Sequence, residues 1–302
     1  MMNNRDAVHS ASTALTITKN HYTMNHYPAN YHTHSLYCDG KSTLEEHVRE
    51  AEKQGLRQLG FSSHSPVPFE NSFAISEEKV PEYVREIDEL QQKTSIKLLK
   101  SLECDFIPGI TKDFEEWRET YHLDYIIGGV HLVRPQHGNG LWFIDGSKQE
   151  TYDNGLRDLF DNNIKAAVTT FWEQTFEMLE TQHLDIIAHF DKIKMHNRDR
   201  FFTEDEQWYK VLADKAIQLI KRHDVIIEVN TRGLYKKRCD HFYPSTELLM
   251  KARQADIPVL ISSDAHKAEE LMLFVPEAIA ELQRCGYDHT ARFDVETGQF
   301  VY

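Results

Sequence analysis

The sequence predicts an α/β fold, a TIM-like barrel in which seven parallel β-strands alternate with α-helices. Short apolar or β-rich runs alternate with segments of helical periodicity, which is typical of repeated βα units. The chain of 302 residues has the length of a one-domain α/β barrel, and no internal repeat or linker divides it. The seven runs are residues 30–33, 58–62, 96–102, 125–130, 184–188, 225–229 and 259–262.

The segments between these runs carry the signals of amphipathic helices. Ser42 and Glu45 have the spacing of a capping box and predict the start of the first helix. Pro81 suits the first turn of the next helix, and Gly286 suits the end of the last one. A longer helix is expected at 161–182. Further helical faces lie at 208–220, 248–252 and 279–282.

The first 27 residues differ in composition from the rest of the chain. They are polar, rich in Ser, Thr, Asn and His, and lack both a periodic apolar face and the apolar stretch of a secretory signal. We predict that residues 1–27 form a disordered tail and that residues 28–302 form a single barrel domain. Met24 is an alternative start site for the chain.

Composition restricts the classes of partner. The formal net charge of -14 argues against binding to a long nucleic acid, which depends on clustered Lys and Arg. A small phosphorylated substrate remains compatible, because a local group of cations can hold it. No apolar run approaches the ~20 residues that span a membrane. Four cysteines without a CxxC pair predict reduced thiols and a cytoplasmic location. The oligomeric state is left open.

Metal-binding residue types follow six of the seven predicted strands. The carboxyl ends of the strands of a β/α barrel meet on one face, where active sites lie. His32 and His34 are two residues apart on one strand, so their side chains point to the same side. A single histidine at a strand end is usually a packed residue, but six such ends are hard to explain by coincidence. The candidate ligands are His32, His34, Asp39, His64, Glu103, His131, His189, Asp264 and His266.

Nine imidazole and carboxylate side chains exceed what one ion needs. Four to six donors satisfy a transition metal, so the set predicts two or three ions that share a bridging carboxylate. Mixed nitrogen and oxygen donors favour zinc, manganese or iron over magnesium or calcium. Clustered ions activate water and hold the oxygens of a phosphoryl group, so the sequence predicts hydrolysis of a phosphoester. Asp185 and Asp191 are weaker candidates, expected to cap helices or to support the ligands.

At these residues the chain resembles the polymerase and histidinol phosphatase (PHP) superfamily, and within it the monofunctional histidinol-phosphatases. The likeness extends from about residue 31 to residue 286. It is carried by the segments His32-Thr33-His34 with Asp39, Ser62-Ser63-His64-Ser65, Leu102-Glu103-Cys104-Asp105, Gly128-Gly129-Val130-His131, Ala188-His189-Phe190-Asp191, Glu228-Val229-Asn230-Thr231 and Ser262-Ser263-Asp264-Ala265-His266.

The resemblance implies a distorted seven-stranded barrel with a trinuclear metal centre. The first ion would be held by His32, His34, Glu103 and Asp264. The second would be held by Glu103, as a bridge, with His131 and His189. The third would be held by Asp39, His64 and His266. Asp39 occupies a position that is histidine in some relatives, which favours the histidinol-phosphatase branch. Glu103, Asp264 and His266 are the implied catalytic residues.

The resemblance also implies a substrate. It predicts a metal-dependent phosphomonoesterase that converts L-histidinol phosphate to L-histidinol and phosphate in histidine biosynthesis. Arg232 lies where the family is expected to contact phosphate, and a surface charge is the alternative. Other readings are a related enzyme acting on a nucleotide or sugar phosphate, and a nonenzymatic relative without metals. The segment 134–150 looks longer than in many relatives, and the general acid is left open.

Overall fold

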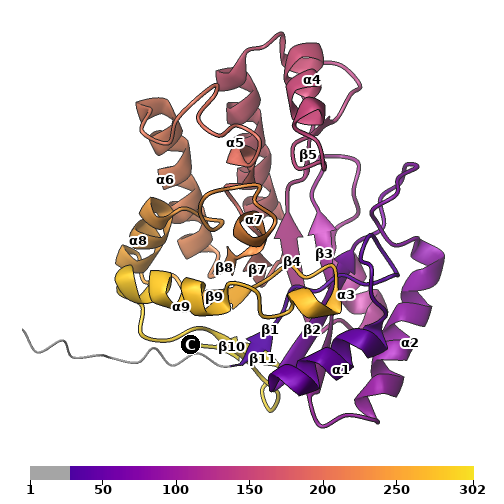
Figure 1. Cartoon of the computed structure of the whole chain (residues 1–302). Helices are drawn as coiled ribbons and strands as arrows, with labels where there is room; N and C mark the ends of the chain where they lie inside the picture. Colours follow the sequence, from indigo (N-terminus) through magenta and orange to yellow (C-terminus); the bar gives the residue numbers. More distant parts are fainter. Residues whose placement is uncertain (1–27) are drawn as a thin grey trace, which may run out of the picture.

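The computed structural model describes residues 28–302, so the predicted tail at 1–27, with Met24, lies outside the described part. Figure 1 shows a sheet of parallel strands surrounded by helices. The strand order is β1-β2-β3-β4-β7-β8-β9, and every neighbouring pair is parallel. The strands are β1 (Ala29–Asn30), β2 (Gln58–His64), β3 (Lys97–Asp105), β4 (Tyr125–Gly129), β7 (Ile186–Ile187), β8 (Ile226–Asn230) and β9 (Val259–Ser262).

The sheet closes on itself just beyond the ends of its first and last strands. Thr33 and Ala265 form a parallel bridge there. The amide of His34 donates to the carbonyl of Ala265 at 2.8 Å, and the amide of Ala265 donates to the carbonyl of His32 at 3.2 Å. The predicted fold class, a distorted barrel of seven parallel strands, is therefore confirmed. Each of the seven predicted runs contains one strand or overlaps it.

Helices follow most of the strands and cover the outside of the barrel (Figure 1). They are α1 (Leu44–Gln54), α2 (Val80–Gln91), α3 (Phe114–Tyr121), α4 (Gln149–Phe160), α5 (Ile164–Thr181), α6 (Gln207–Arg222), α7 (Arg232–Tyr235), α8 (Thr246–Gln254) and α9 (Val275–Arg284). Pro81 lies in the first turn of α2, and Gly286, with a φ of 93°, follows the end of α9, as predicted. None of the helices within residues 28–302 is long and apolar enough to cross a membrane.

Two sequence predictions need correction in detail, and the structure gives a form to the segment 134–150. The cap of α1 is Thr43 rather than Ser42: Thr43 Oγ1 accepts from the amide of Glu46 at 3.1 Å, and Glu46 Oε2 accepts from the amide of Thr43 at 2.8 Å. The helix expected at 161–182 begins at Ile164, because Asp161 is the left-handed cap that ends α4. The segment 134–150 contains the second strand of a hairpin. The hairpin strands are β5 (Leu132–Val133) and β6 (Trp142–Phe143).

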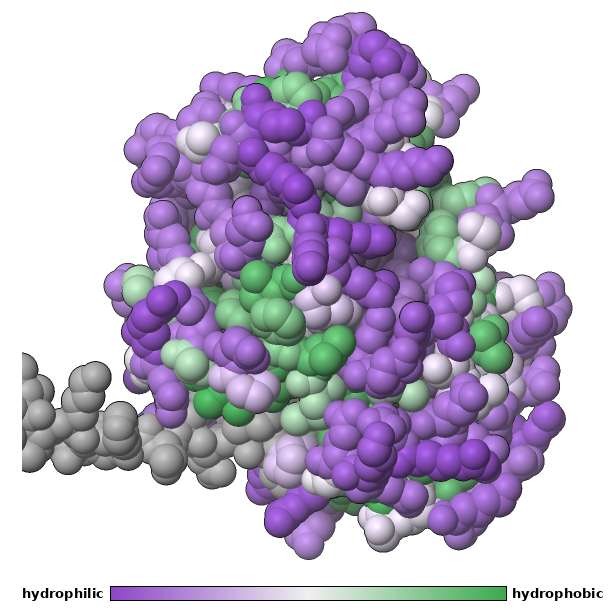
Figure 2. Space-filling model, viewed as in Figure 1, coloured by the Kyte–Doolittle hydropathy of each residue, from purple (hydrophilic) through white to green (hydrophobic). Residues whose placement is uncertain are grey.

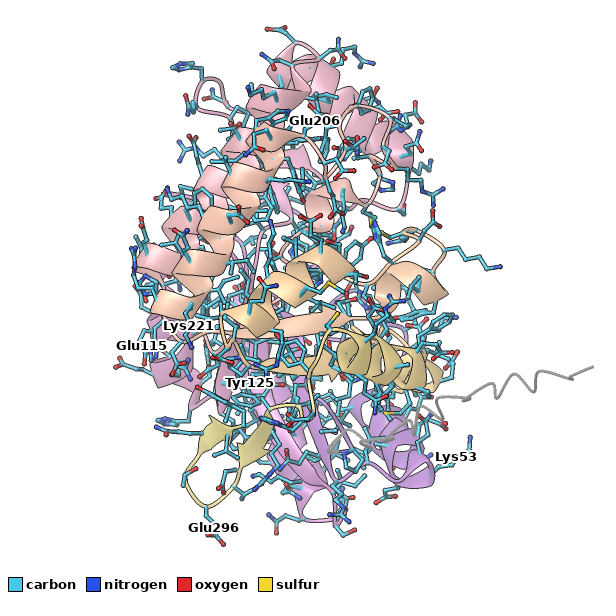
Figure 3. All side chains as sticks on the ribbon, turned by 90° about the vertical axis from the view of Figure 1, so that its left-hand side faces the viewer. Lys53, Glu115, Tyr125, Glu206, Lys221 and Glu296 are labelled. Carbon is cyan, nitrogen blue, oxygen red and sulfur yellow. The ribbon has the colours of Figure 1, made fainter. Side chains whose placement is uncertain are left out.

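An aromatic cluster fills the amino-terminal end of the barrel. The C-terminal hairpin of β10 (Arg292–Asp294) and β11 (Gln299–Val301) packs Phe300 edge-on against Tyr31 and Tyr125, with ring centroids 5.3 and 5.6 Å apart. Figure 3 shows Tyr125 above this hairpin, whose turn carries Glu296. Hydrophilic side chains cover most of the face in Figure 2. Because one end of the barrel is filled, the open end for a site lies at the carboxyl ends of the strands.

The capping box of α1 gives a test of the corrected helix start. Thr43→Ala removes the side-chain oxygen that satisfies the amide of Glu46. We expect a loss of about 1 kcal/mol in the free energy of unfolding, which lowers Tm by about 2 °C in a chain of this size. Thr43→Ser, which keeps the hydroxyl, is the matched control and should stay near wild type in a thermal melt. Equal Tm values for both variants would contradict the cap.

Candidate metal centre

All nine predicted ligands lie at or just beyond the carboxyl ends of the barrel strands. Six of them line a cavity of about 470 Å³: Asp39, His64, Glu103, His131, Asp264 and His266. His64 ends β2, Glu103 lies near the end of β3, and the others follow β1, β4, β7 and β9. His32, His34 and Glu103 are at most 1% exposed. The structure therefore brings together residues that lie more than 230 positions apart in the sequence.

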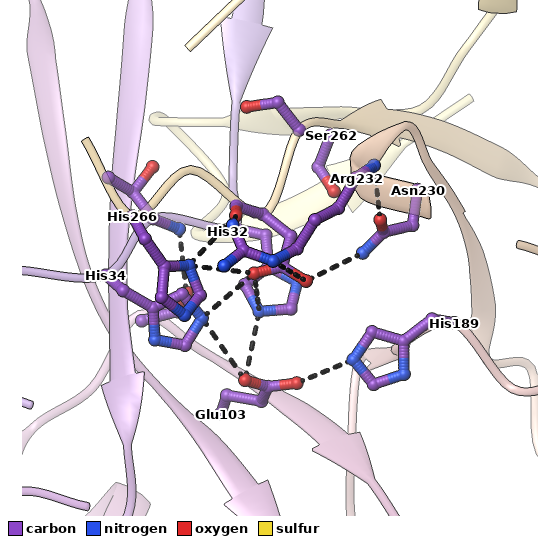
Figure 4. Close-up of polar contacts among 12 residues, drawn as sticks. His32, His34, Glu103, His189, Asn230, Arg232, Ser262 and His266 are labelled. Carbon is purple, nitrogen blue, oxygen red and sulfur yellow. Dashed lines mark hydrogen bonds and ion pairs between the residues drawn. The ribbon is translucent and has the colours of Figure 1, made fainter. Parts of the chain in front are cut away.

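Glu103 occupies the middle of this group. Its Oε1 lies 3.0 Å from His189 Nε2 and 3.3 Å from His131 Nε2. Figure 4 shows His34 and His189 on opposite sides of the Glu103 carboxylate. The two oxygens of one side chain thus face different histidines, as a bridging carboxylate would. The oxygen Oε2 faces His32 Nε2 at 3.1 Å, His64 Nδ1 at 3.2 Å and His34 Nε2 at 3.3 Å.

Two further groups of donor atoms lie beside Glu103. Asp264 Oδ1 is 3.4 Å from His34 Nε2 and 4.0 Å from His32 Nε2. Asp39 Oδ1 is 3.2 Å from His266 Nε2. The groups whose ligand atoms all lie within 4.8 Å of one another are His32, His34 and Asp264; His64, Glu103 and His131; and His34, Asp39, His64 and His266. These groups overlap the three predicted ligand sets, with His34 and His64 each belonging to two, and the assignment of ligands to ions stays a prediction.

The donor atoms themselves indicate that a cation belongs between them. Several buried atoms have no hydrogen-bond partner within residues 28–302, and they point into the centre: His32 Nε2, His34 Nε2, His64 Nδ1, Asp39 Oδ1 and Asp264 Oδ1. A buried polar atom without a partner costs free energy. A metal ion would satisfy ring nitrogens and carboxylate oxygens together, and this mixed set suits zinc, manganese or iron. The residues present therefore fit a metal centre.

Two buried carboxylates orient the histidines from behind. His32 Nδ1 donates to Glu228 Oε1 at 2.5 Å, and His131 Nδ1 donates to Asp105 Oδ1 at 2.5 Å. Each contact fixes the ring tautomer and leaves Nε2 facing the centre, which is how metal-binding histidines are commonly held. Sequence reasoning gave these carboxylates no role. The available signal was spacing, since Asp105 lies two residues after Glu103 on β3 and therefore on the same side of the strand.

Electrostatics keep the central carboxylate ionised. Burial raises the pKa of Glu103, but His32, His64 and His131 outweigh it and hold that pKa well below its usual range. Burial lowers the pKa of His32, yet Glu103 and Glu228 raise it to about 10. Burial and the nearby Lys192 ammonium lower the pKa of His189 to about 4, so its ring is neutral. The ionised carboxylates and the neutral ring of His189 suit a cation, and an ion bound by His32 would displace the proton that Glu103 and Glu228 favour on that ring.

Arg232 lies in the cavity wall beside the centre. Its side chain is 13% exposed, which argues against a free surface charge. Its Nη1 donates to the carbonyl of Asp264 at 2.7 Å and to Tyr235 Oη at 3.1 Å, and lies 3.6 Å from Glu270 Oε2. Figure 4 shows its guanidinium directed toward the histidine cluster. This position permits the predicted phosphate contact, which stays a prediction.

The two weaker candidates lie outside the centre. Asp185 accepts from Arg118 Nη2 and from the amide of Ile126, both at 2.7 Å, at the start of β4. Asp191 accepts from the amide of Ser245 at 2.9 Å and pairs with Lys194 at 2.6 Å. Both therefore hold the scaffold together.

Fold and site define a barrel protein with a His, Asp and Glu cluster that can bind divalent metal. The family model of the PHP domain matches residues 30–232, more than half of the chain. The chain belongs to the PHP domain family.

Curated relatives resemble nearly the whole chain. It is 26% identical over 260 residues to a probable histidinol-phosphatase of Deinococcus radiodurans, covering 84% of this chain and 92% of that protein. It is 23% identical over 280 residues to the histidinol-phosphatase of Bacillus subtilis, covering 84% and 98%. Among solved structures, the histidinol phosphate phosphatase of Lactococcus lactis, complexed with zinc, L-histidinol and phosphate, has a TM-score of 0.68 at 19% identity. That match covers 92% of this chain and 100% of the other, and it supports the fold.

Glu103 gives a direct test of the centre. Glu103→Gln keeps the size of the side chain and removes the charge that would bridge two ions, so metal content per chain should fall. Turnover of phosphoesters should be abolished, while circular dichroism stays close to wild type. Elemental analysis of the purified protein measures the first effect. Glu119→Gln, at an exposed position of α3, is the matched control. A Glu103→Gln protein with normal metal content and activity would refute the assignment.

Proposed function

We propose that the protein is a histidinol-phosphatase, which hydrolyses L-histidinol phosphate to L-histidinol and phosphate in histidine biosynthesis. The observation that carries this proposal is that Glu103 and the other eight ligand candidates form one cluster. The family supports it, because the curated relatives that match over most of their length are named histidinol-phosphatases. A relative that had lost its metals would not be expected to keep every donor. The nonenzymatic alternative is therefore disfavoured.

The nine candidates would hold two or three divalent transition metal ions, with zinc, manganese or iron as the metals that suit the donors. Such ions, when bound, lower the pKa of water and neutralise the charge on phosphoryl oxygens. Glu103 would bridge two of them, and Asp264 and His266 would act in the reaction beside it. Glu228 and Asp105 hold His32 and His131 in the orientation that binding requires.

Positive side chains around the cavity suit a phosphate group. The whole chain has a formal net charge of -14, yet six basic residues line this one cavity. Such a local concentration of cations raises the local concentration of an anionic substrate. Arg232 would hold the phosphate beside Asp264, through the planar fork that suits phosphate oxygens. The basic residues are Lys41, Lys192, Arg232, Lys236, Arg238 and Lys267.

The remaining details belong to the same proposal. The substrate would be a small phosphorylated molecule rather than a long nucleic acid, since the cavity of about 470 Å³ is the size of a small-molecule site. A cytoplasmic location would suit the four cysteines, which are all free thiols. A nucleotide or a sugar phosphate is the alternative substrate, because the phosphate-binding elements would serve any phosphomonoester.

A substrate panel tests the function. Purified protein should release phosphate from L-histidinol phosphate with a kcat/KM at least roughly tenfold above that for nucleoside monophosphates and sugar phosphates. Chelation of metal should abolish the activity, and added zinc, manganese or iron should restore it. Phosphate release is measured for each substrate under the same conditions. Faster turnover of a nucleotide or sugar phosphate would move the assignment to the alternative substrate.

Arg232 separates substrate binding from metal binding. Arg232→Ala should leave metal content unchanged and lower kcat/KM by roughly tenfold to a hundredfold, because a charge-assisted contact is worth ~1.5–3 kcal/mol. Inhibition by free phosphate should weaken in parallel. Arg232→Lys should recover part of the loss, since an ammonium supplies charge without the planar fork. Arg157→Ala, at an exposed arginine outside the cavity, is the control. Unchanged phosphate inhibition in Arg232→Ala would exclude the contact.

A further inference from the structure

The last residue of β6 and the loop that follows it, residues 143–147, form a cavity loop that is held by hydrogen bonds at both ends. Phe143, Asp145, Gly146 and Ser147 contribute to the cavity lining. The amide of Ile144 donates to the carbonyl of His131 at 3.0 Å, and His196 Nε2 donates to the carbonyl of Gly146 at 2.7 Å. This cavity loop is thus fastened next to a ligand candidate. The segment 134–150 therefore helps to build the site.

The cavity loop positions a lysine. Asp145 Oδ2 lies 2.8 Å from Lys192 Nζ, and the two side chains are 13% and 8% exposed. Lys192 belongs to the turn after β7, three residues beyond His189, and its ammonium lines the cavity. An ammonium has three N–H donors, and the contact to Asp145 is the one ion pair that the described residues provide for it. Two donors are therefore left to face the cavity contents.

The position of this ammonium relates it to the centre. Asp145 Oδ2 is also 3.9 Å from His131 Nε2, which in turn lies 3.3 Å from Glu103 Oε1. The distances from Asp145 Oδ2 to Lys192 Nζ and to His131 Nε2, 2.8 and 3.9 Å, bound the third side of the triangle at 6.7 Å. Lys192 Nζ therefore lies no more than 6.7 Å from a ligand candidate of the centre, within the span of a phosphate ester bound there. The ammonium can then reach an oxygen of that ester.

Hydrolysis of an alkyl phosphate needs a proton donor, because the leaving alkoxide is a strong base. We propose that Lys192 is the residue that protonates the leaving oxygen, with Asp145 as its positioning residue. The inference rests on the proposed phosphatase function. As the oxygen of water forms its bond to phosphorus, the bond to the ester oxygen breaks and its electron pair stays on that oxygen. A proton passes from Lys192 Nζ to it, and Nζ regains a proton that the attacking water releases.

The test compares two leaving groups on one variant. Lys192→Met should lower kcat for L-histidinol phosphate by about 100-fold or more, the usual range for loss of a general acid. It should lower kcat for 4-nitrophenyl phosphate by less than roughly tenfold, because nitrophenolate leaves without a proton. Both rates come from the same preparation, so partial loss of folded protein cancels in their ratio. Lys194→Met is the matched control, since Lys194 is buried in an ion pair on the same turn but lies outside the cavity lining.

A second variant keeps the buried charge. Lys192→Arg retains a cation for Asp145 but gives up protons very reluctantly. It should preserve inhibition by free phosphate within about threefold, keep the metal content, and still hydrolyse the alkyl ester poorly. If Lys192→Met fails to fold, this variant carries the same comparison of two substrates.

Three results would overturn the assignment. Equal losses for both substrates would mean that Lys192 binds phosphate and transfers no proton. A loss of metal content would mean that it supports the metal centre. A normal alkyl-ester rate in Lys192→Arg would mean that charge alone suffices. If the wild-type protein prefers another alkyl phosphate over L-histidinol phosphate, the substrate assignment fails. The role of Lys192 can still be tested, because the preferred alkyl phosphate then takes the place of L-histidinol phosphate in the comparison with 4-nitrophenyl phosphate.

Discussion

The position of the Glu103 carboxylate joins the register of the sheet to the chemistry of the site. Glu103 is paired in register with His64 of β2 and Ile127 of β4. Its side chain points into the barrel, and a slip of β3 by one residue would turn it outward. The same slip would remove Asp105 from His131, because the two carboxylates lie on one side of the strand. The metal centre can therefore form only when β3 is paired in this register.

This arrangement would be costly for a protein without a cation. Buried carboxylates and imidazoles lie within 3.0–3.4 Å of one another, and several of their atoms have no hydrogen-bond partner within residues 28–302. If these side chains bind an ion only when the chain is folded, the ion raises the free energy of unfolding. The contact between the rings of Tyr31 and Tyr125, whose centroids are 6.1 Å apart, needs no ion. Packing at the amino-terminal end therefore stabilises the barrel whether or not an ion is bound.

Sequence patterns predicted the parts of this structure that depend on local periodicity and on strand ends. The seven strands and the convergence of His32, Glu103 and Asp264 follow from βα alternation. Tertiary contacts determine the details that these patterns left open, such as the residue that caps α1. Ser42 and Thr43 are both followed three residues later by glutamate, so spacing alone cannot choose the cap; the amide of Ala268 engages Ser42 Oγ at 3.1 Å and leaves Thr43 to cap α1.

The residues that support the site were hidden from the sequence for a related reason. Glu228 lies inside β8 and acts on His32, which is 196 positions away. Asp145 lies in a segment read as an insertion, and its partner Lys192 is 47 positions further along. Residues at strand ends are predictable because topology alone brings them together. The role of a supporting residue such as Glu228 or Asp145 depends on a single partner side chain. Only the folded chain shows which partner lies next to it.

Charge is distributed so that one cavity can serve both cations and an anion. The carboxylates of Glu103, Asp264 and Asp39 lie at the inner end, among histidines, where they would attract metal ions. The basic side chains line the walls, and four of them have acidic partners: Lys192 pairs with Asp145, Arg232 and Lys236 with Glu270, and Lys267 with Glu269. Each ion pair fixes the position of a basic side chain that is only partly exposed to water. Water therefore screens the electric field of that side chain less inside the cavity. The net charge of -14 is a sum over the whole chain, while the charges of the cavity wall determine which ligand is held.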